Sequence, residues 1–86
     1  MKVLVIGHLT GKDIRPYLEA EGRTVAGLRV GGLIGDVFPK SDRTGPILLL
    51  NDTTAAEAPG RLAALPFIEH GLVTFDYIEL DDTSPA

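Results

Sequence analysis

Two stretches of the chain, residues 3–6 and 47–50, are apolar at every position. Their length and the turn-forming residues beside them are typical of β-strands. Because the side chains of a strand alternate between the two faces of its sheet, an unbroken apolar run predicts that both faces are shielded from water. The remaining residues supply only two short helices, which we expect on one side of the sheet. The sequence therefore predicts that a second copy of the chain covers the other side.

The composition indicates one small globular domain. The chain has 86 residues, of which 44% are hydrophobic and 23% are charged. We expect a single domain over residues 1–80 and a short acidic tail over residues 81–86. A chain of this size hides only about 60 to 65% of its unfolded surface when it folds. A homodimer or a higher homo-oligomer would add the missing burial.

Charge and residue types argue against several classes of protein. The chain has no cysteine, which leaves neither a disulfide framework nor a thiolate metal site. The net charge is −4 and the eight Lys and Arg residues are spread along the sequence, which argues against nucleic-acid and anionic-membrane surfaces. The apolar start is too short for a signal peptide, and no segment has the length of a membrane span. We expect a soluble, cytoplasmic protein without a metal or another cofactor.

The first helix is indicated by its start and stop signals. Residues 10–13 have the spacing of a capping box and Pro16 suits a first helical turn, so the helix should begin between these positions. Gly22 interrupts the apolar stripe, where the missing side chain would let the helix lie close to the sheet. The glycine pair at residues 31–32 should end the helix.

A second capping box at residues 54–57 opens the next helical segment. Pro59 and Gly60 interrupt it, so the helix either kinks there or begins only at Pro59. Residues 65–66 should close this helix, and residues 67–72 should form a loop. Three apolar residues form its expected inward face: Ala58, Leu62 and Leu65.

The order of elements predicts the fold. We expect four strands, at residues 2–8, 36–40, 46–50 and 73–80. The second and third strands are joined by a hairpin loop and pair antiparallel. With right-handed crossovers, the order β-α-β-β-α-β gives a ferredoxin-like α+β fold, a four-stranded antiparallel sheet with both helices on one face.

The last third of the chain resembles a known superfamily. Residues 65–72, Leu-Pro-Phe-Ile-Glu-His-Gly-Leu, are followed by the strand Val-Thr-Phe-Asp-Tyr-Ile-Glu-Leu. This ending resembles that of small dimeric α+β barrel proteins, and within them it is most similar to muconolactone isomerase-like and YCII-related proteins. The resemblance implies a homodimer whose sheets face each other, with a cofactor-free pocket in each subunit between sheet and helices. It implies isomerisation, dehydrohalogenation or oxygenation of activated aromatic compounds.

His8 is the first candidate for chemistry. Strand alternation puts it on the face of Leu4 and Ile6, at the end of the first strand, where the sheet opens toward the loops. Histidine exchanges a proton near neutral pH, as proton abstraction beside a carbonyl requires. The alternative is a structural histidine that caps the strand end or bonds a backbone carbonyl.

Asp36 and Asp76 are the candidate catalytic partners of His8. A carboxylate can orient a histidine or exchange a proton with it. Asp36 could instead be a solvated turn residue after Gly35. Asp76 shares its strand face with Ile78, so it has a functional role if that face is dry, and is simply solvated if the strand lies at an edge.

Four further residues are candidates for substrate binding: Tyr17, Phe38, His70 and Tyr77. The two tyrosines could donate hydroxyl hydrogen bonds to a substrate, although amphipathic packing explains them equally well. His70 lies in a loop beside a glycine turn, and pocket rims are often built from such loops. A solvated residue at a helix exit is the simpler interpretation of His70.

Two glycine-rich segments are similar to nucleotide-binding motifs but differ in spacing or order. Residues 7–13 have one residue too few between the glycines, and Asp13 stands where a P-loop has a hydroxyl side chain. Residues 31–35 lie between a helix and a strand, the reverse of the order in dinucleotide-binding proteins. Neither segment predicts nucleotide binding.

The leading hypothesis is a cofactor-free isomerase or lyase that moves protons on a cyclic or conjugated carbonyl compound, such as a lactone, an enone or a polyketide-derived ring. In it, His8 is the acid–base residue, Asp36 or Asp76 its partner, and Tyr17 a donor to the substrate oxygen. One alternative is a non-catalytic small-ligand module with the topology of ACT domains. Another is a cofactor-independent monooxygenase of aromatic polyketides.

Overall fold

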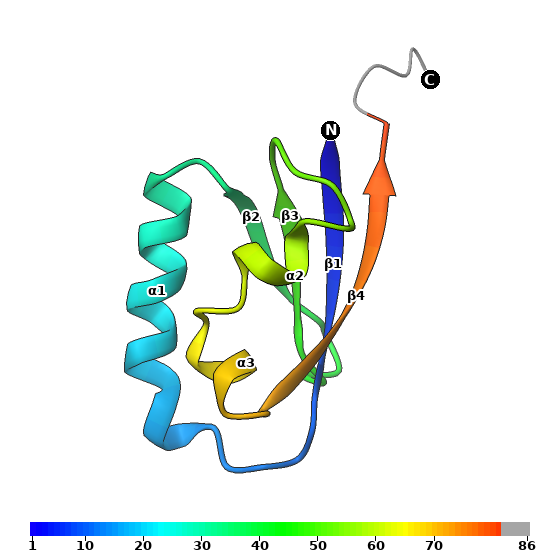
Figure 1. Cartoon of the computed structure of the whole chain (residues 1–86). Helices are drawn as coiled ribbons and strands as arrows, with labels where there is room; N and C mark the ends of the chain where they lie inside the picture. The colour runs from blue at the N-terminus through cyan, green and yellow to red at the C-terminus, as the bar shows by residue number, and fades with distance from the viewer. Residues whose placement is uncertain (82–86) are drawn as a thin grey trace.

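Four antiparallel strands form the sheet of the computed structural model, which describes residues 1–81 (Figure 1). The strands are β1 (Lys2–Leu9), β2 (Ile34–Pro39), β3 (Pro46–Leu50) and β4 (Val73–Leu80). Their order across the sheet is β2-β3-β1-β4, so that β2 and β4 are the edges. This is the ferredoxin-like order, and the predicted α+β fold is confirmed. Apart from Asp81, the predicted acidic tail lies outside the described residues.

The helices are short and cover one face of the sheet. They are η1, a 3-10 turn (Arg15–Tyr17), α1 (Leu18–Val30), α2 (Ala58–Arg61) and α3 (Pro66–Glu69). The core lies between this layer and every second residue of the central strands. Its most deeply buried members are Val3, Val5, Ile34, Leu48, Leu50, Ala58, Leu62 and Leu65. The three residues expected on the inward face of the second helix are therefore confirmed as core residues.

No element within residues 1–81 covers the other face of the sheet. The central strands pair so that Leu4 lies opposite both Leu49 and Ile78. These side chains are half-buried or exposed, with Ile78 at 46%, whereas the adjacent Val3 and Val5 are at 0%. We call this surface the open face; its apolar members are Leu4, Ile6, Phe38, Ile47, Leu49, Ile78 and Leu80.

The capping box predicted at residues 10–13 was wrong. The Thr10 hydroxyl donates to the Gly71 carbonyl at 2.9 Å, and its backbone N–H donates to the Leu72 carbonyl, so Thr10 ties β1 to the start of β4. The interpretation of Gly22 was also wrong. A Cβ built on Gly22 meets no atom within 4 Å, and α1 has no buried residue, because only Val25 and Leu28 pack partly on the core.

The second helical segment begins late, as one of the two alternatives predicted. Thr54 accepts a hydrogen bond from the backbone N–H of Glu57 at 3.2 Å, but this caps a turn, and α2 starts at Ala58 with Pro59 in its first turn. The loop predicted for residues 67–72 was wrong in part, because α3 forms there. The first turn of α3 is capped by Glu21 of α1, whose Oε1 accepts a hydrogen bond from the backbone N–H of Phe67 at 2.9 Å.

Candidate functional site

His8 and Asp76 form a hydrogen-bonded pair on the open face. In the register of β1 and β4, His8 lies opposite Thr74 and Ile6 lies opposite Asp76, so the two side chains are diagonal neighbours on one side of the sheet. His8 Nε2 is 2.9 Å from Asp76 Oδ2. The side chains are 47% and 72% exposed: both lie on the open face, and Asp76 is in addition on the edge strand β4. The structure thus brings together two of the three predicted catalytic residues, and Asp76 is solvated in the single chain.

Lys40 approaches the same imidazole from the other side. It follows β2 directly, and its Nζ is 3.5 Å from His8 Nδ1. An ammonium group can only donate, so Nδ1 of a neutral ring in this arrangement is the acceptor and Nε2 carries the hydrogen that is donated to Asp76. The result is a row of three groups, Asp76, His8 and Lys40, in which the lone pair of His8 Nδ1 faces the Lys40 ammonium group at the long limit of a hydrogen bond.

The three groups border the apolar part of the open face. Ile6 lies opposite Asp76, and Phe38, which is 57% exposed, lies opposite Ile47 on the neighbouring strands. An organic ring placed on these side chains would have His8 and Lys40 at its edge. Phe38 is the predicted substrate-binding residue that shares this face with His8.

Asp36 is not brought to His8. It lies on the edge strand β2, where a register irregularity falls between Ile34 and Val37. Its position is near the Leu50 end of β3, whereas His8 lies beyond the other end of that pairing, past Ile47. Asp36 is exposed, and its side chain makes no hydrogen bond or ion pair with any residue in 1–81.

The remaining candidates lie on the helix-covered side. The rings of Tyr17 and His70 stack with centroids 4.2 Å apart, and Tyr17 packs against the small cluster of Phe67, Leu72 and Val73. Tyr77 packs edge-on to Phe75, with centroids 6.2 Å apart, and burial raises the pKa of its hydroxyl group. The sheet therefore separates these three rings from His8 and Asp76.

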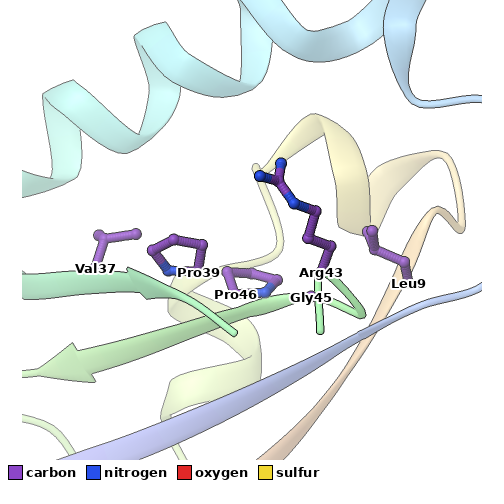
Figure 2. A pocket seen from close by; sticks show the side chains of 6 residues that line it. All are labelled: Leu9, Val37, Pro39, Arg43, Gly45 and Pro46. Atoms are coloured by element: carbon purple, nitrogen blue, oxygen red, sulfur yellow. The ribbon is translucent and has the colours of Figure 1, made fainter. Parts of the chain in front are cut away.

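A cavity of about 290 Å³ lies on the helix-covered side, at the tip of the β2–β3 hairpin (Figure 2). Its lining residues are Leu9, Val37, Pro39, Arg43, Gly45 and Pro46. Val37 is paired with the buried Leu48, which identifies the side of the sheet on which the cavity opens. No candidate residue from the sequence lines it. Lys40 and Arg43 were both missed, and the signal that could have found Lys40 was the hairpin register next to the end of β1.

Neither a family model nor a curated protein matches this sequence. Within residues 1–81, no three His, Asp or Glu side chains are grouped so that they could hold a metal ion. No helix of that part of the chain is long and apolar enough to cross a membrane.

Proposed function

We propose that the protein is a cofactor-free isomerase or lyase that moves protons on a cyclic or conjugated carbonyl compound, such as a lactone, an enone or a polyketide-derived ring. The observation that supports this most is the row of Asp76, His8 and Lys40. In it, the acceptor nitrogen of a histidine faces an ammonium group at 3.5 Å, at the border of an apolar surface.

Each group has a distinct role in this proposal. His8 Nδ1 takes a proton from the carbon beside the substrate carbonyl and returns it at a second position. Asp76 accepts the Nε2–H, which orients the ring and stabilises the imidazolium that forms. The Lys40 ammonium donates to the carbonyl oxygen, where negative charge develops in the enolate. The 3.5 Å separation of Lys40 and His8 is at the long limit of a hydrogen bond, so a substrate oxygen can replace it.

The site needs a cover that excludes water. A second copy of the chain, placed with its open face against the first, would enclose the His8 row and bury the apolar residues around it. This arrangement is that of the dimeric α+β barrel proteins, which the last third of the sequence resembles, and we propose that the chain belongs with them. The reaction would then take place between the two sheets.

Proton abstraction can be tested before the product is known. Unsaturated five-membered lactones and cyclic enones are incubated with the protein in D₂O, and exchange of the proton beside the carbonyl is followed by ¹H NMR. We expect at least one compound to exchange faster than in buffer. In the folded His8→Ala protein the protein-dependent rate should fall by about 10² or more. Asp36→Asn, which removes a carboxylate outside the site, should keep the wild-type rate.

Two outcomes would contradict the proposal. The first is undiminished exchange in folded His8→Ala protein, which would remove His8 as the base. The second is no exchange with any compound, together with a thermal shift caused by free amino acids, which would favour the small-ligand module instead.

A further inference from the structure

We infer that the cavity at the tip of the β2–β3 hairpin binds a small carboxylate that carries one apolar ring. This goes beyond the proposed function, because the cavity opens on the opposite side of the sheet from His8 and shares none of its residues.

The lining of the cavity is apolar apart from one charged side chain. Leu9, Val37, Pro39 and Pro46 form its wall, and Pro39 lies directly opposite Pro46 across the hairpin. Figure 2 shows these side chains on one side of the strands, with the Arg43 side chain rising from the loop on the same side. Ligand sites in proteins commonly combine such a wall with a few polar groups that orient the ligand.

The guanidinium of Arg43 has no partner within residues 1–81. The nearest carboxylate in sequence is Asp42, but its Oδ1 accepts both the backbone N–H of Thr44, at 3.0 Å, and the Thr44 hydroxyl, at 2.7 Å. These two bonds lower the pKa of Asp42 and keep it ionised within its own turn. In a protein with net charge −4, the apolar cavity is thus lined by a cation that has no partner among residues 1–81.

The loop that carries Arg43 is held in place by backbone hydrogen bonds. The Arg43 N–H donates to the Lys40 carbonyl at 2.9 Å, and the Leu9 N–H donates to the Thr44 carbonyl at 2.7 Å. Arg43 has a φ of 61°, a left-handed conformation that few residues other than glycine and asparagine adopt readily. The backbone that carries the Arg43 side chain is therefore ordered before any ligand binds, so the loop itself loses little entropy on binding.

The chemistry and the volume define the ligand class. A guanidinium presents a planar pair of donors that match the two oxygens of a carboxylate. A cavity of 290 Å³ is roughly twice the size of an apolar protein cavity that takes up benzene. It has room for one ring with a carboxylate on a short arm.

The test is an NMR titration of ¹⁵N-labelled protein with phenylacetate and, separately, with the uncharged isostere phenylacetamide. We expect phenylacetate to shift the backbone amides of Leu9, Arg43 and Gly45 and to bind at least about tenfold more tightly than phenylacetamide. Arg43→Asn should lower the affinity for phenylacetate to that for the amide, since asparagine keeps the left-handed turn without the charge. The matched control is Arg29→Asn, on exposed α1, which should bind as wild type does.

The inference is overturned if acid and amide bind equally to the wild-type protein, if neither binds at millimolar concentration, or if Arg43→Asn leaves the affinity for phenylacetate unchanged. It is also overturned if the shifted amides lie on β4 around Asp76, because the carboxylate would then occupy the open face. The comparison of acid with amide uses the unmodified chain, so it decides the matter even if a variant folds poorly.

Discussion

Single residues in this protein connect elements that are far apart in the chain. Glu21 is an example. Its half-buried carboxylate extends from α1 and accepts a hydrogen bond from the backbone N–H of Phe67 in α3. Burial raises the pKa of Glu21, and the hydrogen bond from Phe67 offsets this only in part. The folded state therefore holds the Glu21 proton more tightly than the unfolded state does.

Glu21 should make stability fall as pH rises. Its contribution to the free energy of unfolding is largest below the ordinary glutamate pKa of 4.5 and is lost as pH rises through the raised value. Glu21→Gln keeps an oxygen acceptor for Phe67 and removes the charge, so it should be at least as stable as wild type at pH 7 and lose this component of the pH dependence. Urea denaturation at pH 4 and pH 7 measures it. The control is Glu19→Gln, at an exposed glutamate of the same helix. An equal change in the pH dependence of the free energy of unfolding in both variants would contradict the assignment.

The tautomer of His8 is a second prediction for a single residue. Because Lys40 can only donate to Nδ1, the neutral ring should carry its hydrogen on Nε2, where Asp76 accepts it. A long-range ¹H–¹⁵N correlation spectrum distinguishes the two nitrogens. Lys40→Met should weaken this preference, and a spectrum with the hydrogen on Nδ1 in the wild-type protein would contradict the geometry.

The sequence was sufficient to place His8 on the face of Leu4 and Ile6 and Asp76 on the face of Ile78, because strand alternation determines the face of each residue. It was not sufficient for Lys40 and Arg43. Both lie at the hairpin, and their roles depend on which strand the hairpin tip approaches, which local patterns do not encode. Asp36 was misplaced as a partner for a related reason, since its distance from His8 depends on the register across three strands.

At the scale of elements, strands were predicted more accurately than helices. The bounds of β3 and β4 agree with the prediction, since continuous or alternating apolar patterns specify strands directly. The helices depend on contacts between distant residues. Thr10 has the spacing of a helix cap, but its hydroxyl donates a hydrogen bond to the Gly71 carbonyl. The first turn of α3 is capped by Glu21, which is 46 residues away from Phe67 in sequence.

Two glycines should respond oppositely to alanine. Gly45 has a φ of 154°, and a Cβ there would overlap the carbonyl of Gly7, so Gly45→Ala should lower the free energy of unfolding by about 2 kcal/mol or more. Gly22 lies in exposed α1 with free space around it, so Gly22→Ala should raise that free energy by about 0.5 to 1 kcal/mol. Chemical denaturation measures both. A destabilised Gly22→Ala protein would mean that α1 packs more closely on the sheet than described.

At the scale of the whole molecule, the central feature is the difference between the two faces of the sheet. Val3, Val5, Leu48 and Leu50 are at most 3% exposed beneath the helices, whereas their neighbours along the same strands face outward. The apolar side chains of the open face lie next to the row of Asp76, His8 and Lys40. Exposed apolar surfaces of this kind commonly mark association sites.

Leu4→Lys tests whether the open face is the association surface. Leu4 lies at the centre of that face, opposite Leu49 and Ile78, and is not part of the buried core. The charged side chain should therefore prevent association while the chain still folds. Circular dichroism checks the fold, and an oligomer that persists in Leu4→Lys would place the interface elsewhere.

The most direct measurement is the mass of the wild-type protein in solution, determined by light scattering coupled to size-exclusion chromatography at micromolar concentration. Sheet-to-sheet pairing predicts a folded particle of at least about twice the 9.2 kDa of one chain. A well-folded particle of 9.2 kDa would show that the open face tolerates water, and would contradict both the covered sheet and the enclosed His8 site.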